Sequence, residues 1–562
     1  MTNRRDFLKT AGCGLAFAAA ASAPRITRAG QSQKKRPNIL FIMTDDHAAH
    51  AISAYGSRIN RTPNMDRLAA EGALFQDVFV TNSICTPSRA CILTGMYSCK
   101  NGVPVFNDIS PKIKTVGGTL RDAGYYTALI GKWHMGGPKT VRNDDWDRWA
   151  IYQNQGVYFN PYFFTTTEKC PFGLESHLKK GILRFPGEYA SENITRVTQC
   201  VIDEALANDK PFFVMMLHKA PHRNWIPSEK YKKVFRSKTL ADIPCPETLF
   251  DDYAGRASPI KHTRMTLEHH MRIEEDLKLT EYFSEGGVFP GVDPEQYKTG
   301  ESKNRWPKEL RDQPALSDEE RERRRKERIK LSYLRYMQDY LACVQSVDDS
   351  VGDMLAYLKQ KGIDQDTLVV YTADQGFFLG DHGLYDKRFM MEETLKMPFL
   401  IRWPSTVKPG TVNTDIITNV DFAAFFADVA NVPQPANWQG RSFLPNITTG
   451  TPKDWRRSFY YRYYIQGGEH GTPAHYGVRT ARYKLICYYK VDEWELFDLK
   501  TDPEELNNLY GKPAYAGVTE ALKNELFRLK AAVGDSDQYY NCGEYGGQIE
   551  PPLSTNAANI FE

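Results

Sequence analysis

Beyond residue 29 the 562-residue sequence has no apolar run that approaches the roughly 18 residues a transmembrane helix requires. It also lacks a Cys-x-x-Cys pair, so no zinc site of that pattern is predicted. Its formal net charge is only +3, and such a weak field draws the chain neither to nucleic acid nor to a membrane. Hydrophobic residues make up 41% and aromatic residues 12%, which excludes an intrinsically disordered chain.

The first 29 residues have the features of a twin-arginine export signal. Arg4 and Arg5 precede an apolar stretch at 12–23, and the small residue at the end of 27–29 suits a signal peptidase. An uncleaved membrane anchor is the alternative, for which the apolar stretch is short. The signal carries a net charge of +4, so the remaining chain is at −1. We therefore expect the Tat translocase as a partner, and a periplasmic or secreted mature protein without a membrane span.

Cysteine is sparse, with ten in the whole chain and nine beyond the signal. An exported protein can form disulfides, but their connectivity is not readable from sequence. Apart from Cys85, we interpret most of the others as scattered buried thiols. They are Cys91, Cys99, Cys170, Cys200, Cys245, Cys343, Cys487 and Cys542.

Four short apolar runs predict buried parallel strands, each followed at once by ionisable residues. They cover residues 38–44, 125–131, 211–217 and 367–373. Helical patterns at 192–208 and 333–361 lie between them. This alternation predicts an α/β sandwich (α/β/α) around a mostly parallel sheet, in which ligands bind beyond the carboxyl ends of the strands.

A basic segment, residues 319–330, admits two interpretations. Its seven basic and four acidic side chains suggest nucleic-acid binding, but Ser317 and Glu320 form a capping box that starts a helix. Mixed charges at this spacing favour an exposed helix face. Residues 223–316, which are polar and weakly periodic, are predicted to be an insertion over one face of the sheet.

After about residue 435 the pattern changes to short β-like runs followed by a helix. The runs cover 458–464, 475–480, 482–489 and 494–498, and the helix 518–533. We predict a smaller C-terminal domain with an antiparallel sheet and a helix. The predicted limits are 36–435 for the N-terminal domain, 436–545 for the C-terminal one and 546–562 for a tail.

Two pairs of ligand-type residues follow the first and fourth strands. Asp45 and Asp46 end one strand, and Asp374 and Gln375 end another. Adjacent carboxylates repel unless a cation lies between them, so the two pairs together predict a divalent metal ion. A single pair would be interpreted as a solvated turn.

The string Cys85-Thr86-Pro87-Ser88-Arg89 is the most specific motif. Thr86 is predicted as a helix N-cap and Pro87 as the first helical residue, which puts Cys85 just ahead of a helix N-terminus that favours an anion. Further basic residues lie in GKWHMG, LHKAPHRNW and LYDKRF, where they are Lys132, His134, His222 and Lys387.

This set of motifs, in the order DD, CTPSR, KWH, APH, DQG and DK, resembles the type I sulfatases of the alkaline phosphatase superfamily. The resemblance implies an alkaline-phosphatase-like fold. It also implies that a formylglycine-generating (sulfatase-maturating) enzyme oxidises Cys85 to formylglycine, also called 3-oxoalanine. Its hydrate would attack sulfur, and Ca²⁺ would be the metal ion.

The resemblance also assigns roles to the residues of these motifs. The metal ligands would be Asp45, Asp46, Cys85, Asp374 and Gln375, where most sulfatases have asparagine in place of Gln375. Arg89, Lys132 and Lys387 would stabilise the sulfate, His222 would protonate the leaving oxygen, and His134 would take the proton of the second hydroxyl. His218 is a weaker candidate, and His382 a supporting residue.

Longer strings, including HKAPHRNWIPSEKY and HYGVRTARYKLI, resemble bacterial N-acetylglucosamine-6-sulfatase-like enzymes. The expected substrate is a sulfated saccharide, from glycosaminoglycans or from other polysaccharides such as carrageenan or ulvan. Arg223, Asn224, Trp225, His475 and Arg479 are the predicted substrate contacts. A phosphatase or phosphodiesterase of the same superfamily and a non-catalytic carbohydrate-binding relative are the alternatives.

Overall fold

The computed structural model describes residues 36–284, 286, 316–540 and 542–545. The predicted export signal and the predicted C-terminal tail lie outside the described residues, as does most of the second half of the predicted insertion. The described residues from 37 onward belong to one compact unit.

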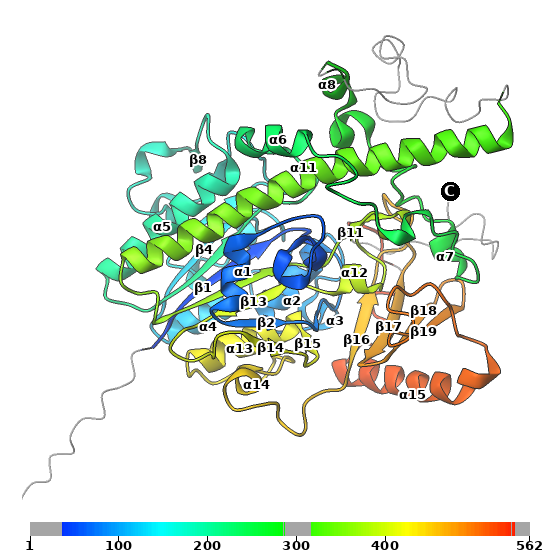
Figure 1. The fold of residues 1–562 in the computed structure, drawn as a ribbon. Helices are drawn as coiled ribbons and strands as arrows, with labels where there is room; N and C mark the ends of the chain where they lie inside the picture. Colours follow the sequence, from blue (N-terminus) through cyan, green and yellow to red (C-terminus); the bar gives the residue numbers. More distant parts are fainter. Residues whose placement is uncertain (1–35, 285, 287–315, 541, 546–562) are drawn as a thin grey trace, which may run out of the picture. The chain divides into compact units, whose positions relative to one another are not determined.

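The four predicted strands form the centre of an eleven-stranded sheet (Figure 1). They are β1 (Asn38–Thr44), β4 (Tyr126–Gly131), β9 (Phe212–Leu217) and β10 (Thr367–Ala373). Their order across the sheet is β10-β1-β9-β4, and every neighbouring pair is parallel. Every residue of the four is buried, which explains why they are continuous apolar runs. The predicted fold class is confirmed.

Shorter strands extend the sheet on both sides. Beyond β10 lie β13 (Phe399–Arg402), β2 (Ala73–Phe75) and β14 (Thr411–Asn413), and beyond β4 lie β5 (Arg148–Tyr152), β6 (Tyr162–Phe164), β8 (Ile182–Arg184) and β7 (Leu178–Lys179). The pairs β10–β13, β13–β2, β5–β6, β6–β8 and β7–β8 are antiparallel. Antiparallel pairing is therefore confined to the flanks.

Helices cover both faces of the sheet, and strand β1 shows how the two cores are divided. Ile39, Phe41 and Met43 join one hydrophobic core, whereas Leu40 and Ile42 join the other, because alternate side chains of a strand point to opposite faces. The first core is closed by helices α2, α4 and α13, and the second by α1, α5, α6 and α11. Their bounds are α1 Pro63–Ala70, α2 Cys85–Thr94, α4 Val116–Asp122, α5 Ala190–Ala207, α6 Glu229–Arg236, α11 Asp318–Gln360 and α13 Phe422–Val429.

Helix α11 is a single helix of 43 residues that crosses the sheet in Figure 1. The Ser317 hydroxyl accepts a hydrogen bond from the Glu320 backbone N–H, as the predicted cap requires. Ion pairs one turn apart, such as Arg324–Glu320 and Arg323–Glu327, run along its first turns. The basic segment is therefore an exposed helix face with internal charge compensation, and it continues directly into the predicted 333–361 helix.

The C-terminal part forms a four-stranded antiparallel sheet in the order β16-β17-β18-β19. The strands are β16 (Ser458–Tyr463), β17 (His475–Thr480), β18 (Tyr483–Tyr488) and β19 (Glu493–Asp498), and helix α15 (Ala516–Val533) packs against the first three. Arg256, from the 223–284 segment, forms a fully buried ion pair with Glu495 of β19 at 2.7 Å. The sequence thus predicted these elements correctly, while the domain limits stay predictions.

No helix in the described ranges has both the length and the apolar character needed to cross a bilayer. The nine cysteines in these ranges are free thiols, seven of them buried.

Candidate active site

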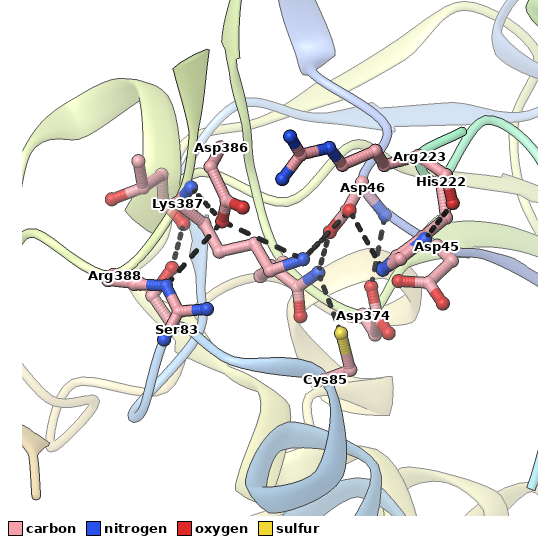
Figure 2. A network of polar contacts seen from close by, with 12 residues as sticks. Asp45, Asp46, Ser83, Cys85, His222, Arg223, Asp374, Asp386, Lys387 and Arg388 are labelled. Carbon is pink, nitrogen blue, oxygen red and sulfur yellow. Dashed lines mark hydrogen bonds and ion pairs between the residues drawn. The ribbon is translucent and has the colours of Figure 1, made fainter. Parts of the chain in front are cut away.

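Three carboxylates meet where the central strands end (Figure 2). Asp45 and Asp46 follow β1 and Asp374 follows its neighbour β10, so the parallel pairing brings them to one edge of the sheet. One oxygen from each lies within 4.8 Å of the others, and none of the three residues is more than 1% exposed. The Asp46 backbone N–H donates to Asp374 Oδ1 at 3.3 Å. Burial raises the pKa of Asp46 to about 7, although Lys387 opposes this rise.

Three basic side chains face these carboxylates. Lys132, which follows β4, is paired with Asp45, and Arg89 of α2 contacts Asp374 Oδ2 through Nε at 2.9 Å. The Lys387 ammonium donates to both oxygens of Asp46, at 2.6 and 2.7 Å (Figure 2). Burial would lower the pKa of Lys387, but Asp46 and the other acidic groups nearby raise it above its ordinary value. All three predicted sulfate-binding cations therefore lie in the cluster.

The oxygen atoms that could act as metal ligands fit a divalent cation that prefers oxygen. Within the described part of the chain, no hydrogen-bond donor serves Asp45 Oδ1 or Gln375 Oε1, although both atoms are buried. Gln375 donates through Nε2 to Asp46 Oδ1 at 2.5 Å, so its carbonyl oxygen is left for a metal ion. Carboxylate and amide oxygens are the ligands of Ca²⁺ and Mg²⁺. Asp45, Asp46, Asp374, Gln375 and residue 85 could together hold such an ion.

Cys85 is the first residue of α2, and only 1% of its surface is exposed. Its Sγ lies 3.9 Å from Gln375 Nε2. The predicted cap was wrong by two residues: Ile84 is the N-cap, because the Thr86 hydroxyl instead donates to the His134 carbonyl at 2.7 Å. Burial raises the pKa of the Cys85 thiol to about 12, so an unmodified residue 85 is a protonated, weak nucleophile.

Each of the two predicted catalytic histidines contacts a residue of this cluster or one next to it. His222 Nε2 is 3.6 Å from Asp46 Oδ2, and His134 Nδ1 is 3.4 Å from the Thr86 hydroxyl. Burial lowers the pKa of both rings well below the ordinary value. His218 is different: it is buried beside Ser350, and burial lowers its pKa to about 3.

The structure brings only part of the predicted substrate set to the site. Arg223 lies next to His222 (Figure 2), with its guanidinium held by Asp276 at 2.6 Å, and Asn224 is exposed.

The other three predicted contacts are buried: Trp225 and His475 present no surface to a sugar, and Arg479 is only 4% exposed. Trp225 packs on Tyr336 and Tyr340, and its exposure is 0%. His475, also at 0%, is surrounded by aromatic rings including those of Phe389 and Tyr461. Arg479 of β17 is paired with Glu392 at 3.0 Å.

Sequence reasoning missed Gln155 and Tyr158, which lie in the loop between β5 and β6. Gln155 contacts both Lys132 and His134, and Tyr158 contacts the His222 backbone. Nothing in the surrounding string QNQGVY distinguishes this loop from an ordinary polar turn. It also missed Asp386, whose carboxylate lies between His470 at 3.1 Å and the Lys387 ammonium at 3.9 Å.

This site and fold are those of a hydrolase with the alkaline-phosphatase-like architecture. The family model described as "Sulfatase" matches residues 37–432, and the one described as "N-sulphoglucosamine sulphohydrolase, C-terminal" matches residues 380–532. The chain therefore belongs to the sulfatase family and is a sulfuric ester hydrolase.

Among its relatives, the chain is 38% identical to the N-acetylglucosamine-6-O-sulfatase of Bacteroides thetaiotaomicron, over 90% of this chain and 88% of that protein. It is 25% identical to the uncharacterized sulfatase YidJ of Escherichia coli, over 90% and 89%. The solved structure of BT4656 in complex with its substrate D-glucosamine-2-N,6-O-disulfate superposes with a TM-score of 0.76 at 38% identity, covering 90% of this chain and 99% of that one. The phosphonate monoester hydrolase of Silicibacter pomeroyi, at 19% identity and a TM-score of 0.62 over 89% and 96%, shares the fold.

Proposed function

We propose that this sulfatase removes sulfate esters from glucosamine units of glycosaminoglycan-type saccharides. The observation that carries the proposal is the 38% identity, along nearly the whole chain, to an N-acetylglucosamine-6-O-sulfatase. The relative whose structure holds a disulfated glucosamine supports the same substrate class. The ulvan-active sulfatases are more distant, at 23% identity, which makes a marine polysaccharide the weaker choice.

The nucleophile that we propose is formylglycine made from Cys85. Burial holds the pKa of this thiol at about 12, so the unmodified side chain is unsuited to attack at neutral pH. As a hydrate, formylglycine supplies one hydroxyl for attack on sulfur and a second whose proton can be removed so that sulfate leaves. We also propose Ca²⁺ as the bound ion, since the ligand set consists of oxygen atoms.

The chain's own residues supply charge and protons around this group. Arg89, Lys132 and Lys387 are positioned to offset negative charge on the transferring sulfate. His222, whose Nε2 faces the cluster, would protonate the departing sugar oxygen, and His134 would accept the proton of the second hydroxyl.

Residues 1–29 lead us to propose export through the Tat translocase to the periplasm or the medium. A polymeric substrate outside the cytoplasm agrees with this route. Cell fractionation of the full-length chain and of an Arg4→Lys/Arg5→Lys variant tests it: the variant should stay in the cytoplasm. Equal export of both would contradict the twin-arginine route.

The main experiment combines peptide mass spectrometry with substrate profiling. The peptide that contains residue 85 should show the loss of mass expected when a thiol becomes an aldehyde, and the purified enzyme should release sulfate from 6-sulfated glucosamine. Matched sulfate and phosphate aryl esters separate the alternatives. Faster phosphate release would indicate a phosphatase, and binding without turnover would indicate a carbohydrate-binding relative.

A further inference from the structure

A short segment near the end of the chain, residues 542–545, reaches the active site. It follows helix α15 and lies beyond residue 532, where the match to the C-terminal family model ends. We infer that Tyr545 is a substrate-binding residue, whose ring forms an apolar platform for a sugar ring at the mouth of the site. This inference rests on the proposed function, because it names the residue that would receive the saccharide.

Hydrogen bonds of the backbone hold the 542–545 segment in place. Cys542 forms a β-bridge with Ile465, and its carbonyl accepts a hydrogen bond from the Gln466 N–H at 3.3 Å. Two residues further on, the Glu544 carbonyl accepts from the Phe106 N–H at 3.0 Å. The backbone that leads to Tyr545 is therefore fixed at two points.

The Glu544 side chain joins the segment to the active site. Its carboxylate accepts from the Glu469 N–H at 3.3 Å and pairs with the Arg388 guanidinium at 3.5 Å. Arg388 follows Lys387 directly, and the Lys387 ammonium is bound to Asp46 (Figure 2). Through Arg388 the segment thus adjoins the carboxylate cluster.

The Tyr545 ring adjoins the site through a second aromatic residue. Its centroid lies 6.1 Å from that of Phe106, which in turn lies 5.7 Å from that of His134. Phe106 packs against the core, whereas Tyr545 is 78% exposed, so most of its ring is open to solvent. One face of a sugar ring carries mainly C–H groups, and packing it on an aromatic ring removes apolar surface of both from water.

Such a platform should affect binding of the sugar and not the chemistry at sulfur. In the described contacts the Tyr545 ring touches none of the groups that we assign to the reaction. An interaction that is equally strong in the ground state and the transition state lowers KM without changing kcat. Inorganic sulfate has no sugar ring, so its binding should not depend on Tyr545.

The first test compares Tyr545→Ala with Tyr545→Phe. With 6-sulfated glucosamine we expect Tyr545→Ala to raise KM about threefold to tenfold, the effect of uncovering one face of an aromatic ring, and to keep wild-type kcat. Tyr545→Phe retains the ring and should keep wild-type KM. The inhibition constant of inorganic sulfate should be the same in all three proteins. An unchanged KM in Tyr545→Ala, an equal loss in Tyr545→Phe, or a matching loss in sulfate inhibition would overturn the inference.

The second test is Glu544→Ala, which removes the side-chain anchor of the segment. KM for 6-sulfated glucosamine should rise, because the platform is no longer held against the site. If Glu544 acts through Tyr545, the double variant Glu544→Ala/Tyr545→Ala should be no worse than the more affected single variant. Additive losses would show that Glu544 acts by another route, and would overturn its anchoring role.

Tyr540 provides a matched control a few residues earlier. It is exposed too, but its ring lies 5.1 Å from that of Tyr489 and 3.6 Å from the Lys490 ammonium. Tyr540→Ala should keep wild-type KM and kcat, with thermal unfolding recorded for every variant. A rise in KM as large as in Tyr545→Ala would show that any disturbance of this part of the chain suffices, and would overturn the inference.

The wild-type enzyme separates the two possible failures. If it hydrolyses 6-sulfated glucosamine and Tyr545→Ala does so with the same KM, only the platform is refuted. If it releases no sulfate from this substrate, the proposed function is refuted, and the inference falls with it.

Discussion

Around residue 85 three carboxylates and three basic side chains are buried together, which balances their formal charges. A divalent ion among them would leave an excess of positive charge. That excess is what a sulfate ester, with its single negative charge, requires for binding and for stabilisation in the transition state.

Replacing one carboxylate tests the ion directly. We expect Asp374→Asn to lower the metal content measured by plasma mass spectrometry and to lower sulfatase activity by roughly a hundredfold or more, since it removes a ligand and the partner of Arg89. Asp203→Asn, which changes an exposed carboxylate on α5, is the control and should keep both. Full metal occupancy in Asp374→Asn would contradict the proposed ligand set.

His382 provides a test of stability against pH, away from the metal ligands. Burial alone would lower its pKa, but a 2.8 Å hydrogen bond to Asp251 and the nearby Glu393 raise the pKa above the ordinary 6.5. A raised pKa gives stability that is fully present below pH 6.5 and is lost as the pH rises through the folded-state value. His382→Gln should therefore cost about 2 kcal/mol below pH 6.5 and less at pH 9, as measured by calorimetry. A difference that grows with pH would contradict this assignment.

At the level of the elements, the ends of the central strands position several of the catalytic groups, and Gly131 at the end of β4 is tightly constrained. Its φ is +109°, and a Cβ there would lie 2.0 Å from the Leu217 carbonyl oxygen of β9. We expect Gly131→Ala to cost more than the roughly 1–2 kcal/mol of a left-handed residue alone, and to lower activity because Lys132 follows directly.

Gly362→Ala is the matched control, since Gly362 has φ +68° and open space around it. The Gly362→Ala variant should lose only the stability that an alanine at positive φ costs, and it should keep full activity. Equal losses of stability in the two variants would show that the contact with β9 has no influence.

The sequence predicted regular elements well because burial leaves a clear pattern in them. All four central strands were predicted within one residue, since strands buried on both faces are continuous apolar runs. The start of α2 was misplaced because the hydroxyl of Thr86, the predicted N-cap, forms a tertiary hydrogen bond to the His134 carbonyl instead. No local pattern reports such a contact.

The residues of the site also fall into two groups, those that the sequence predicted and those that it did not. The carboxylates, Gln375 and Lys132 stand directly after central strands, so topology alone brings them together. Gln155 and Tyr158 reach the site from a polar loop whose path no motif encodes. Trp225 and His475 were predicted to contact the sugar, but an aromatic or imidazole ring in a string shared with related enzymes can equally fill the core, as both do here.

For the molecule as a whole, the buried pair Arg256–Glu495 connects the 223–284 segment to the C-terminal sheet, and both side chains are 0% exposed. We expect Arg256→Met to lower the free energy of unfolding by about 3–5 kcal/mol, because it leaves the Glu495 charge buried without its partner. The double variant Arg256→Met/Glu495→Met should recover much of this loss in denaturant titrations.

Arg323→Met, in an exposed pair on α11, is the control and should leave the unfolding midpoint unchanged. A double variant as unstable as the single one would show that packing around Arg256, and not charge, connects the two parts.

The burial of Cys85 also determines an order of events. Cys85 is the first residue of α2 and only 1% of it is exposed, so the active site of a modifying enzyme could not reach its sulfur in the folded protein. Any catalyst that oxidises this thiol must therefore meet the chain while it is still unfolded, during or just after synthesis. If Cys85 is converted to formylglycine as proposed, oxidation and folding would compete in time, and a cell that folds this chain too fast would accumulate a stable protein that can never be activated.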